Sequence, residues 1–282
     1  MRRTIAHEIS ADGKALHSGA TVRMTLSPAA SGTGIVFRRA DLGGKEIPAL
    51  YDRVGETRLG TVIAEDGASV GVIEHLMAAV AGAGIDDLIV TVDGPEPPIL
   101  DGDALSYLTL IEKAGIKKQA GARRAFKVKR PVEVTIKDAV IRLLPSETSE
   151  YRYDLDYSNT KAIGKQSYAM TLTPETFARE IAPARTFGFM HELEALNKMG
   201  LGRGASLENT LAIDGDEVTN KTLMRFPDEF VRHKILDAIG DMALAGGPLI
   251  ARFEGVKSGH ATNNAVLREL FSDPANYEVV EG

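Results

Sequence analysis

Two short segments indicate how this chain is organised: Leu-Ile-Val-Thr-Val-Asp-Gly at residues 88–94 and Leu-Ile-Ala-Arg-Phe-Glu-Gly at residues 249–255. Leucine, isoleucine and glycine are identical between them, and the fifth and sixth positions match in chemical kind. The first five residues of each segment, 88–92 and 249–253, are typical of a buried strand. A repeated segment in the same context predicts two units of related topology.

The residues around both segments repeat the same order of elements. The helix before the first strand is predicted to end near Gly82 and Gly84, and the helix before the second spans residues 227–245 and ends at residues 246–247. A further helix is expected to begin at Asp101, a good N-cap residue. Other strands are predicted at residues 21–26, 34–38, 132–136 and 139–144. We therefore predict an α+β fold with two related two-layer domains, each a small sheet packed on helices.

A basic stretch separates the two predicted domains. Residues 116–131 contain seven lysines and arginines and no acidic residue. Such a run is typically a solvated linker, and the alternative is a patch that faces an anionic ligand or a membrane surface. We place the boundary near residue 122, which gives an N-terminal domain over residues 1–122 and a C-terminal domain over residues 123–282.

Composition excludes several classes of protein. The 282 residues carry 33 Lys and Arg against 39 Asp and Glu, a net charge of −6, so no general nucleic-acid binder is expected. There is no cysteine, which excludes disulfides, thiolate nucleophiles and Fe–S clusters, and any metal must be held by carboxylates and the six histidines. The N-terminus lacks the apolar core of a signal peptide and no long apolar run occurs, so no membrane span is expected and the cytoplasm is the expected location.

The predicted helix at residues 227–245 carries polar residues on one face. His233 and Asp237 are four residues apart and project from the same face, and Asp241 lies one turn further along. A histidine and an aspartate at this spacing can chelate a divalent ion. The alternative is a solvated polar stripe in which His233 only pairs with Asp237, and spacing alone does not separate the two.

The neighbours Glu74 and His75 lie on the first predicted helix. Adjacent helical residues point about 100° apart, so one or both must face a cleft or water rather than a common core. Together with His233 and Asp237, His75 gives two histidines and one carboxylate, a set that can hold catalytic zinc with an open fourth position. Glu74 would then be a carboxylate base beside the metal. The alternative is an ordinary exposed Glu-His pair.

Three further segments are candidates for function. His260 lies in a glycine-bearing loop over residues 256–261, where it would be a usable general acid or a plain surface histidine. Residues 185–190 are apolar and aromatic with one hydroxyl, which is typical of core packing. Residues 190–207 predict an amphipathic helix followed by a glycine-rich turn, either as a buried core helix or as a wall for an apolar ligand.

Eight segments, in this order along nearly the whole chain, closely resemble the UDP-3-O-acyl-N-acetylglucosamine deacetylase family, the zinc amidases of lipid A synthesis. The segments are Leu16-His17-Ser18-Gly19, Val36-Phe37-Arg38-Arg39, Thr57-Arg58-Leu59, Glu74-His75-Leu76-Met77-Ala78-Ala79, Pro98-Ile99-Leu100-Asp101-Gly102, Ala184 to Met190, Asp228 to Asp241, and Lys257-Ser258-Gly259-His260-Ala261. Each segment is weak evidence by itself, but eight in the same order are unlike a chance match.

The resemblance implies two α+β domains packed face to face with the active site between them. It implies that His75, His233 and Asp237 bind Zn²⁺, and Fe²⁺ is a second plausible occupant because metal availability often decides. The remaining catalytic matches are Glu74 as general base, His260 as general acid, Asp241 as the carboxylate that partners this histidine, and Thr186 as the hydroxyl that helps to hold the oxyanion.

The resemblance also implies a substrate site for an acylated UDP-amino sugar. Lys234, Lys257 and Phe189 match residues that contact the sugar nucleotide, and Asp156-Tyr157 match an acid-aromatic pair near the uracil. Residues 186–210 match an insert that forms the acyl tunnel. The full set of candidate substrate-binding residues is Leu16, Asp156, Tyr157, Phe187, Phe189, Met190, Leu193, Leu196, Leu201, Lys234 and Lys257.

The sequence departs from the family pattern without losing a catalytic group. Val72-Ile73 stands where Thr-Val is usual, Asp103 stands where Ser is usual, and Ser158-Asn159-Thr160 replaces a His-Pro element. The expected enzyme is a monomeric zinc-dependent amidase that catalyses the committed step of lipid A synthesis. Two alternatives are a divergent paralogue that acts on another N-acyl amino sugar and a catalytically silent regulator with the same fold.

Overall fold

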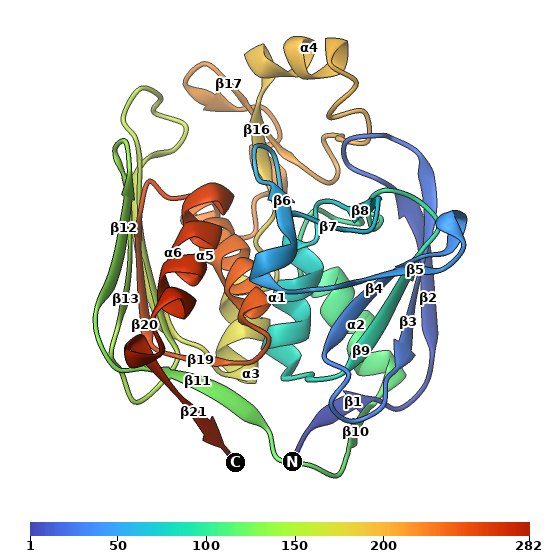
Figure 1. The fold of residues 1–282 in the computed structure, drawn as a ribbon. Helices are drawn as coiled ribbons and strands as arrows, with labels where there is room; N and C mark the ends of the chain where they lie inside the picture. The colour runs from blue at the N-terminus through green and yellow to red at the C-terminus, as the bar shows by residue number, and fades with distance from the viewer.

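Two five-stranded sheets frame the molecule, which a computed structural model describes over all of residues 1–282 (Figure 1). The first sheet contains, in spatial order, β2 (Ile9–Lys14), β3 (Thr21–Pro28), β9 (Leu88–Val92), β4 (Ile35–Arg39) and β5 (Lys45–Pro48). The second contains β12 (Val132–Ile136), β13 (Ala139–Leu144), β20 (Arg252–Val256), β14 (Glu150–Tyr157) and β15 (Gly164–Thr171). In each sheet the central strand is parallel to one neighbour, β4 or β14, and all other pairs are antiparallel. The shared order confirms an α+β fold built from two related units.

The strands form where apolar residues alternate with polar ones. In β3 the side chains of Val22, Met24 and Leu26 are buried, whereas Arg23 between them is exposed. Successive strand residues point to opposite faces of the sheet, so this alternation gives β3 one face toward the core. Leu26 lies opposite Val90 of β9, which fixes the register with buried residues on the same face.

Four helices fill the space between the two sheets (Figure 1). They are α1 (Glu74–Ala83), α2 (Leu105–Ala114), α5 (Glu229–Met242) and α6 (His260–Ser272). The central pair is α1 and α5, and α1 is buried on almost every side. A Cβ atom on Gly240 would lie 2.0 Å from the carbonyl oxygen of Glu74, so only glycine permits this close crossing. The crossing brings the first turn of α1 against the second half of α5.

The remaining elements close the ends of the molecule. The two-stranded and three-stranded sheets are β1 (Arg3–Ile5) with β10 (Ile116–Lys118); β11 (Arg124–Val128) with β19 (Leu249–Ile250) and β21 (Tyr277–Glu281); β6 (Val54–Glu56) with β7 (Val62–Glu65) and β8 (Ala68–Val70); and β16 (Phe187–Phe189) with β17 (Leu211–Asp214) and β18 (Glu217–Val218). The other helical segments are α3 (Pro174–Thr176), which continues into a π-turn at Phe177–Ile181, and α4 (Met190–Lys198). Short 3₁₀ turns lie at Ala40–Leu42, Tyr51–Arg53, Lys221–Leu223, Ala243–Ala245 and Pro274–Asn276. No helix is both long enough and apolar enough to cross a membrane.

The basic stretch at residues 116–131 is not a linker along its whole length, so that prediction is wrong for both of its ends. β10 pairs antiparallel with β1, and β11 pairs antiparallel with β21 and parallel with β19. Pairing satisfies the backbone groups of both ends, while the side chains of Lys117 and Lys118 remain exposed to solvent. Only residues 119–123 connect the two strands.

The strand predicted at residues 249–253 is divided between two sheets. β19 pairs with β11, and after Ala251 the chain enters β20 in the second five-stranded sheet. Gly82 does not end α1, which continues to Ala83. A Cβ atom at residue 82 would lie 2.1 Å from the ring of Phe177, so this glycine permits close packing inside the helix. The helix ends at Gly84, whose φ of 68° is left-handed.

Asp101 does not cap α2 as predicted, because the helix begins at Leu105 and its N-cap position is Ala104. The carboxylate of Asp103 accepts a hydrogen bond from the backbone N–H of Ser106 at 3.0 Å, within the first turn of α2. Asp103 is buried and forms an ion pair with Arg225, whereas Asp101 is exposed. The tight turn at Gly102, with a φ of 73°, separates the two aspartates. The residue that departs from the family pattern therefore accepts a hydrogen bond from the first turn of the helix.

Candidate active site

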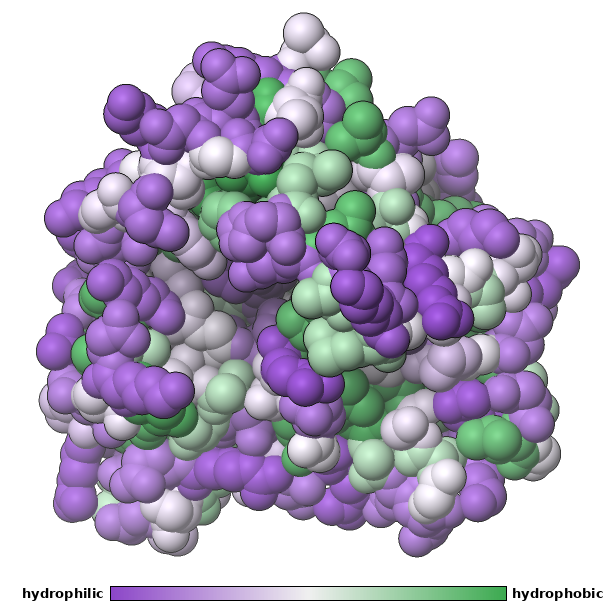
Figure 2. Space-filling model, turned by 90° about the horizontal axis from the view of Figure 1, so that it is seen from above, coloured by the Kyte–Doolittle hydropathy of each residue, from purple (hydrophilic) through white to green (hydrophobic).

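An open cleft of about 800 Å³ lies between the two halves of the molecule. The first turns of α1 and α6, the face of α5 that carries His233 and Asp237, and the tip of the β12–β13 hairpin all contribute to its wall. Figure 2 shows the molecule from above, the side on which α4 and β17 lie in Figure 1, with apolar residues exposed among hydrophilic ones. The chemically active side chains lie at the contact between α1, α5 and α6.

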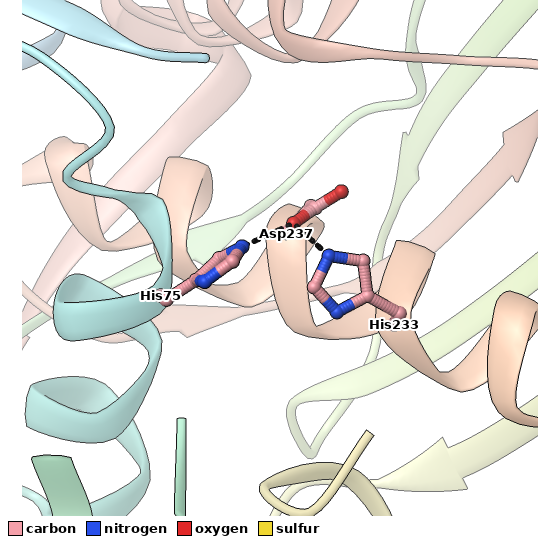
Figure 3. A group of neighbouring side chains, drawn as sticks. All are labelled: His75, His233 and Asp237. Atoms are coloured by element: carbon pink, nitrogen blue, oxygen red, sulfur yellow. Dashed lines mark ion pairs between the residues drawn. The ribbon is translucent and has the colours of Figure 1, made fainter. Parts of the chain in front are cut away.

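Three potential metal ligands converge in this cleft (Figure 3). His75 comes from the first turn of α1, and His233 and Asp237 lie one turn apart on α5. The Nε2 atoms of His75 and His233 lie 3.6 and 3.3 Å from Oδ1 of Asp237, and the three ligand atoms all lie within 4.8 Å of one another. The structure therefore brings together the three residues that the sequence predicted as a set.

The protonation states of His75, His233 and Asp237 favour the binding of a cation. Burial lowers the pKa of His75 to about 3 and also lowers the pKa of His233, so both imidazoles are neutral near pH 7. His233 Nδ1 lies 3.1 Å from the carbonyl oxygen of Ala184, which orients Nε2 toward Asp237. Burial alone would raise the pKa of Asp237, but the positive charge of Lys234, together with the neighbouring histidines, outweighs burial and holds this pKa below its usual range. Oδ1 of Asp237 and Nδ1 of His75 are buried without a hydrogen-bond partner.

Glu74, Asp241 and His260 form a second group beside the first, one residue from each of α1, α5 and α6. His260 Nδ1 lies 2.8 Å from Oδ2 of Asp241, and its Nε2 lies 3.7 Å from Oε1 of Glu74. Burial alone would lower the pKa of His260, but the negative charges of Asp241 and Glu74 outweigh burial and raise this pKa to about 9. Burial raises the pKa of Glu74 to about 7, although His260 opposes the shift. The group combines a carboxyl that titrates near neutral pH with a charged imidazole.

Two residues of this group were missed at the level of sequence. Thr61, in the loop between β6 and β7, donates hydrogen bonds to Glu74 and Asp241. Asn263 on α6 donates from Nδ2 to Oδ2 of Asp241 at 2.7 Å. Asn263 follows His260 by three residues, and this helical spacing is a signal that could have found it. Thr61 has no such signal, because its contacts join a loop to two distant helices.

Several predicted substrate-binding residues line the cleft. These residues are Leu16, Asp156, Tyr157, Phe187, Lys234 and Lys257, and the predicted oxyanion-binding residue Thr186 lines it too. The two lysines differ in their surroundings. Nζ of Lys234 is bound to Oδ2 of Asp237 at 2.7 Å, whereas Nζ of Lys257 lies 3.6 and 3.7 Å from the carboxylates of Asp138 and Asp156. Lys257 is also the more exposed of the two, and so the more available to an anionic ligand.

The other predicted substrate-binding residues lie outside the wall of this cleft, in the insert. They are Phe189, Met190, Leu193, Leu196 and Leu201. The ring of Phe189 lies 5.7 Å from that of Tyr157, so the insert adjoins the cleft through aromatic contact. No residue of α4 is buried, which contradicts the interpretation of residues 190–207 as a buried core helix.

The three glycines that follow α4 have two different roles. Gly200 and Gly202 adopt left-handed φ angles of 79° and 68°, which let the chain reverse after the helix. A Cβ atom on Gly204 would lie 2.1 Å from the carbonyl oxygen of Ala15, and its N–H donates to the carbonyl of Leu16 at 2.9 Å. The turn therefore attaches the insert to the N-terminal half of the molecule.

Comparison with known proteins identifies close relatives of this chain. A family model described as UDP-3-O-acyl N-acetylglycosamine deacetylase matches residues 2–272. A protein of Myxococcus xanthus (strain DK1622), named UDP-3-O-acyl-N-acetylglucosamine deacetylase, is 45% identical over 280 residues. The alignment covers 99% of this chain and 89% of that protein, so the likeness includes every element that lines the cleft.

Proposed function

The chain belongs to the UDP-3-O-acyl N-acetylglycosamine deacetylase family, and from this premise we propose that it hydrolyses the N-acetyl amide of UDP-3-O-acyl-N-acetylglucosamine and releases acetate. The reaction would require a divalent metal ion and would be the committed step of lipid A synthesis. One observation carries the proposal: three metal-ligand atoms and a carboxyl–imidazole pair converge in a single cleft between the two halves.

We assign His75, His233 and Asp237 as the ligands of a Zn²⁺ ion. Two neutral imidazoles and an ionised carboxylate are ligands that zinc commonly uses, and three protein ligands leave a fourth position open. The buried Oδ1 of Asp237 has no hydrogen-bond partner, and a cation would satisfy it. Fe²⁺ is a second plausible occupant because the same ligands suit it. When bound, the metal supplies a Lewis acid that polarises a carbonyl and lowers the pKa of water.

The neighbouring residues would move the protons. Oε1 of Glu74 faces His260 and would take the proton from the attacking water. The leaving group is an amine, which is too basic to leave unprotonated, so it needs an acid. Nε2 of His260 would donate that proton, and Asp241 holds the ring by Nδ1 and keeps it charged near pH 7. The hydroxyl of Thr186 would donate to the oxyanion, and its loss should cost roughly 10²-fold or more in kcat.

The walls of the cleft suit a sugar nucleotide with an acyl chain. Lys257 and Lys234 would face its anionic groups, with Lys257 the more accessible cation. Tyr157 and Phe187, whose ring centroids are 6.2 Å apart, would provide an aromatic wall near the uracil. The acyl chain would run along the half-buried leucines of the insert, Leu193 and Leu196.

We further infer a cytoplasmic, monomeric enzyme that acts on this small molecule and not on nucleic acid. The net charge of −6 gives no general attraction to a polyanion. Two alternative functions would contradict this proposal. A divergent paralogue would prefer another N-acyl amino sugar, and a silent regulator would bind the sugar nucleotide without hydrolysing it.

The test is deacetylation of UDP-3-O-acyl-N-acetylglucosamine by the purified protein, followed as acetate release. We expect turnover that a chelator abolishes and that Zn²⁺ or Fe²⁺ restores. A parallel assay on N-acetylated amino sugars without the UDP or the acyl group should give rates lower by orders of magnitude. Binding without turnover would support the silent regulator, and faster turnover of another amino sugar would support the paralogue.

A further inference from the structure

Thr61 contacts both of the carboxylates that flank His260. It lies in the loop between β6 and β7 and is only 1% exposed. Its backbone N–H donates to Oε2 of Glu74 at 2.9 Å, and its hydroxyl donates to Oδ1 of Asp241 at 2.5 Å. One residue thus joins two acidic groups that come from different helices.

Thr61 and His260 use opposite oxygens of the same two carboxylates. The imidazole approaches Oδ2 of Asp241 at 2.8 Å and Oε1 of Glu74 at 3.7 Å, which are the oxygens that Thr61 leaves free. In each carboxylate, one oxygen is therefore bound by Thr61 and the other oxygen faces the imidazole ring of His260. The four residues form a closed arrangement in which Thr61 lies opposite His260.

The backbone before Thr61 is shaped for this approach. Gly60 has a φ of 151°, and a Cβ atom there would lie 3.0 Å from Oε1 of Glu74. A side chain at residue 60 would crowd the oxygen that faces His260, whereas glycine lets the loop pass close enough for the next N–H to reach Oε2.

We propose that Thr61 is a positioning residue that fixes the planes of Glu74 and Asp241 for proton transfer. A carboxylate plane rotates easily about its terminal bond, because such torsions have broad energy wells. The hydroxyl of Thr61 is the donor on Oδ1 of Asp241, since His260 and Asn263 both bond to Oδ2. Without this hydroxyl, a buried charged oxygen loses its donor, and the carboxylate plane is held only through the two bonds to Oδ2. The inference rests on the proposed deacetylase function, because proton transfer is the step that it serves.

Two substitutions separate positioning from packing. Thr61→Val keeps the shape of the side chain and the backbone N–H but removes the hydroxyl, and Thr61→Ser keeps the hydroxyl but removes the methyl group. We expect Thr61→Val to lower kcat about 10- to 100-fold with KM within twofold, the loss typical of a hydrogen bond to a charged group. We expect Thr61→Ser to retain kcat within about threefold, as hydroxyl rescue requires. Metal content should stay equal to that of the wild type in both variants.

A second readout does not depend on turnover. The Nδ1 proton of His260, hydrogen-bonded to a carboxylate, should give a downfield proton NMR signal that is absent in His260→Gln. Thr61→Val should shift or broaden this signal, and Thr61→Ser should leave it in place. If the wild type hydrolyses no substrate, the proposed function fails while this signal still tests the placement of the ring.

The inference is overturned by either of two results. Wild-type kcat and an unchanged NMR signal in Thr61→Val would show that the hydroxyl positions nothing. Equal losses in Thr61→Val and Thr61→Ser would show that Thr61 only fills space. If Thr61→Val does not fold, Thr61→Ala takes its place, because it removes the hydroxyl without adding volume, and the same two outcomes then decide.

Discussion

The contact between α1, α5 and α6 differs from the α4 insert in which side chains are buried and which are exposed to solvent. At the helix contact, the side chains of His233, Asp237 and Asp241 are buried, and each is held by a hydrogen bond or an ion pair. In α4 no residue is buried, and Met190 is 40% exposed although it is apolar. Each region thus carries the residue type that its environment disfavours, and buried polar or exposed apolar groups are informative for that reason.

The difference indicates two kinds of functional contribution. The polar groups at the helix contact are fixed before any ligand arrives, as catalysis by preorganised groups requires. The apolar side chains of α4 gain stabilisation only if a ligand covers them, as an acyl chain would. Substitutions at the helix contact should therefore act on chemistry with large effects, and substitutions in α4 should act on acyl recognition with graded effects.

The largest expected effect is that of His233→Ala. The substitution removes one of the three ligand atoms that lie within 4.8 Å of one another. We expect the variant to lose its metal and to lose kcat/KM by more than about 10³-fold, exceeding the loss of a single oxyanion donor. Elemental analysis measures the metal content, and acetate release from the same sample measures kcat/KM.

Glu74→Gln is the matched control for this prediction. It keeps the size of the side chain beside His75 but cannot accept the proton of water. We expect it to retain one metal per chain while kcat falls at least as far as for a lost general base, about 10²- to 10⁴-fold. A full complement of metal in His233→Ala, or metal loss in Glu74→Gln, would reverse the roles assigned to the two residues.

A smaller effect, seen mainly in pH dependence, is expected from Asp241→Asn. Asp241 makes the largest contribution that raises the pKa of His260, which reaches about 9. The histidine must be protonated to act as an acid, so activity should be lost as pH rises through this pKa. Without the charge of Asp241 the pKa falls, and the alkaline limb of the kcat profile should move to lower pH by at least about one unit.

The pH–rate profiles of the wild type and Asp241→Asn measure this shift. The apparent pKa values belong to the coupled group and not to His260 alone, so the comparison uses the difference between the two profiles. An alkaline limb at the same pH in both proteins would show that Asp241 does not hold the charge on the acid.

The smallest effect is expected in the insert, from Leu193→Ala. Leu193 is half-buried and lies near Gly202 on the turn that follows α4. If it contacts the acyl chain, its truncation should cost long-acyl substrates about 1 kcal/mol, or roughly fivefold in kcat/KM. A non-acylated analogue should be almost unaffected, and the melting temperature should change little.

The control in the same helix is Glu194→Ala, which alters an exposed residue paired with Lys198 and should leave both substrates unchanged. Equal losses of Leu193→Ala on acylated and non-acylated substrates, with destabilisation by about 2–5 kcal/mol, are what a packed core position would give. That result would show that α4 contributes to stability and not to acyl recognition.

Helical spacing accounts for what the sequence predicted at the helix contact. His233, Asp237 and Asp241 repeat every four residues, so a helix brings them to one face. That Glu74, His75 and His260 meet this face was implied only by the family resemblance. Thr61 could not be predicted, because its partner Asp241 is 180 residues away and the hydrogen bond depends on tertiary packing.

The errors in the predicted fold have local causes. Asp101 and Asp103 are equally good capping residues by type, and only the tertiary structure shows that Asp103 is buried against Arg225 while Asp101 is exposed. The apolar run at residues 249–253 has one strand-like pattern, but a break at Ala251 passes it from one sheet to another. Such a change of partner leaves no trace in hydrophobic periodicity.

The central claim is that one divalent ion, held by His75, His233 and Asp237, lies between the two halves of the molecule and makes it a deacetylase. Anomalous diffraction at the zinc absorption edge, from crystals of protein with measured activity, tests this claim most directly. We expect a single peak bounded by Nε2 of His75, Nε2 of His233 and Oδ1 of Asp237. Active protein whose crystals show no metal peak, or a peak held by other residues, would contradict it.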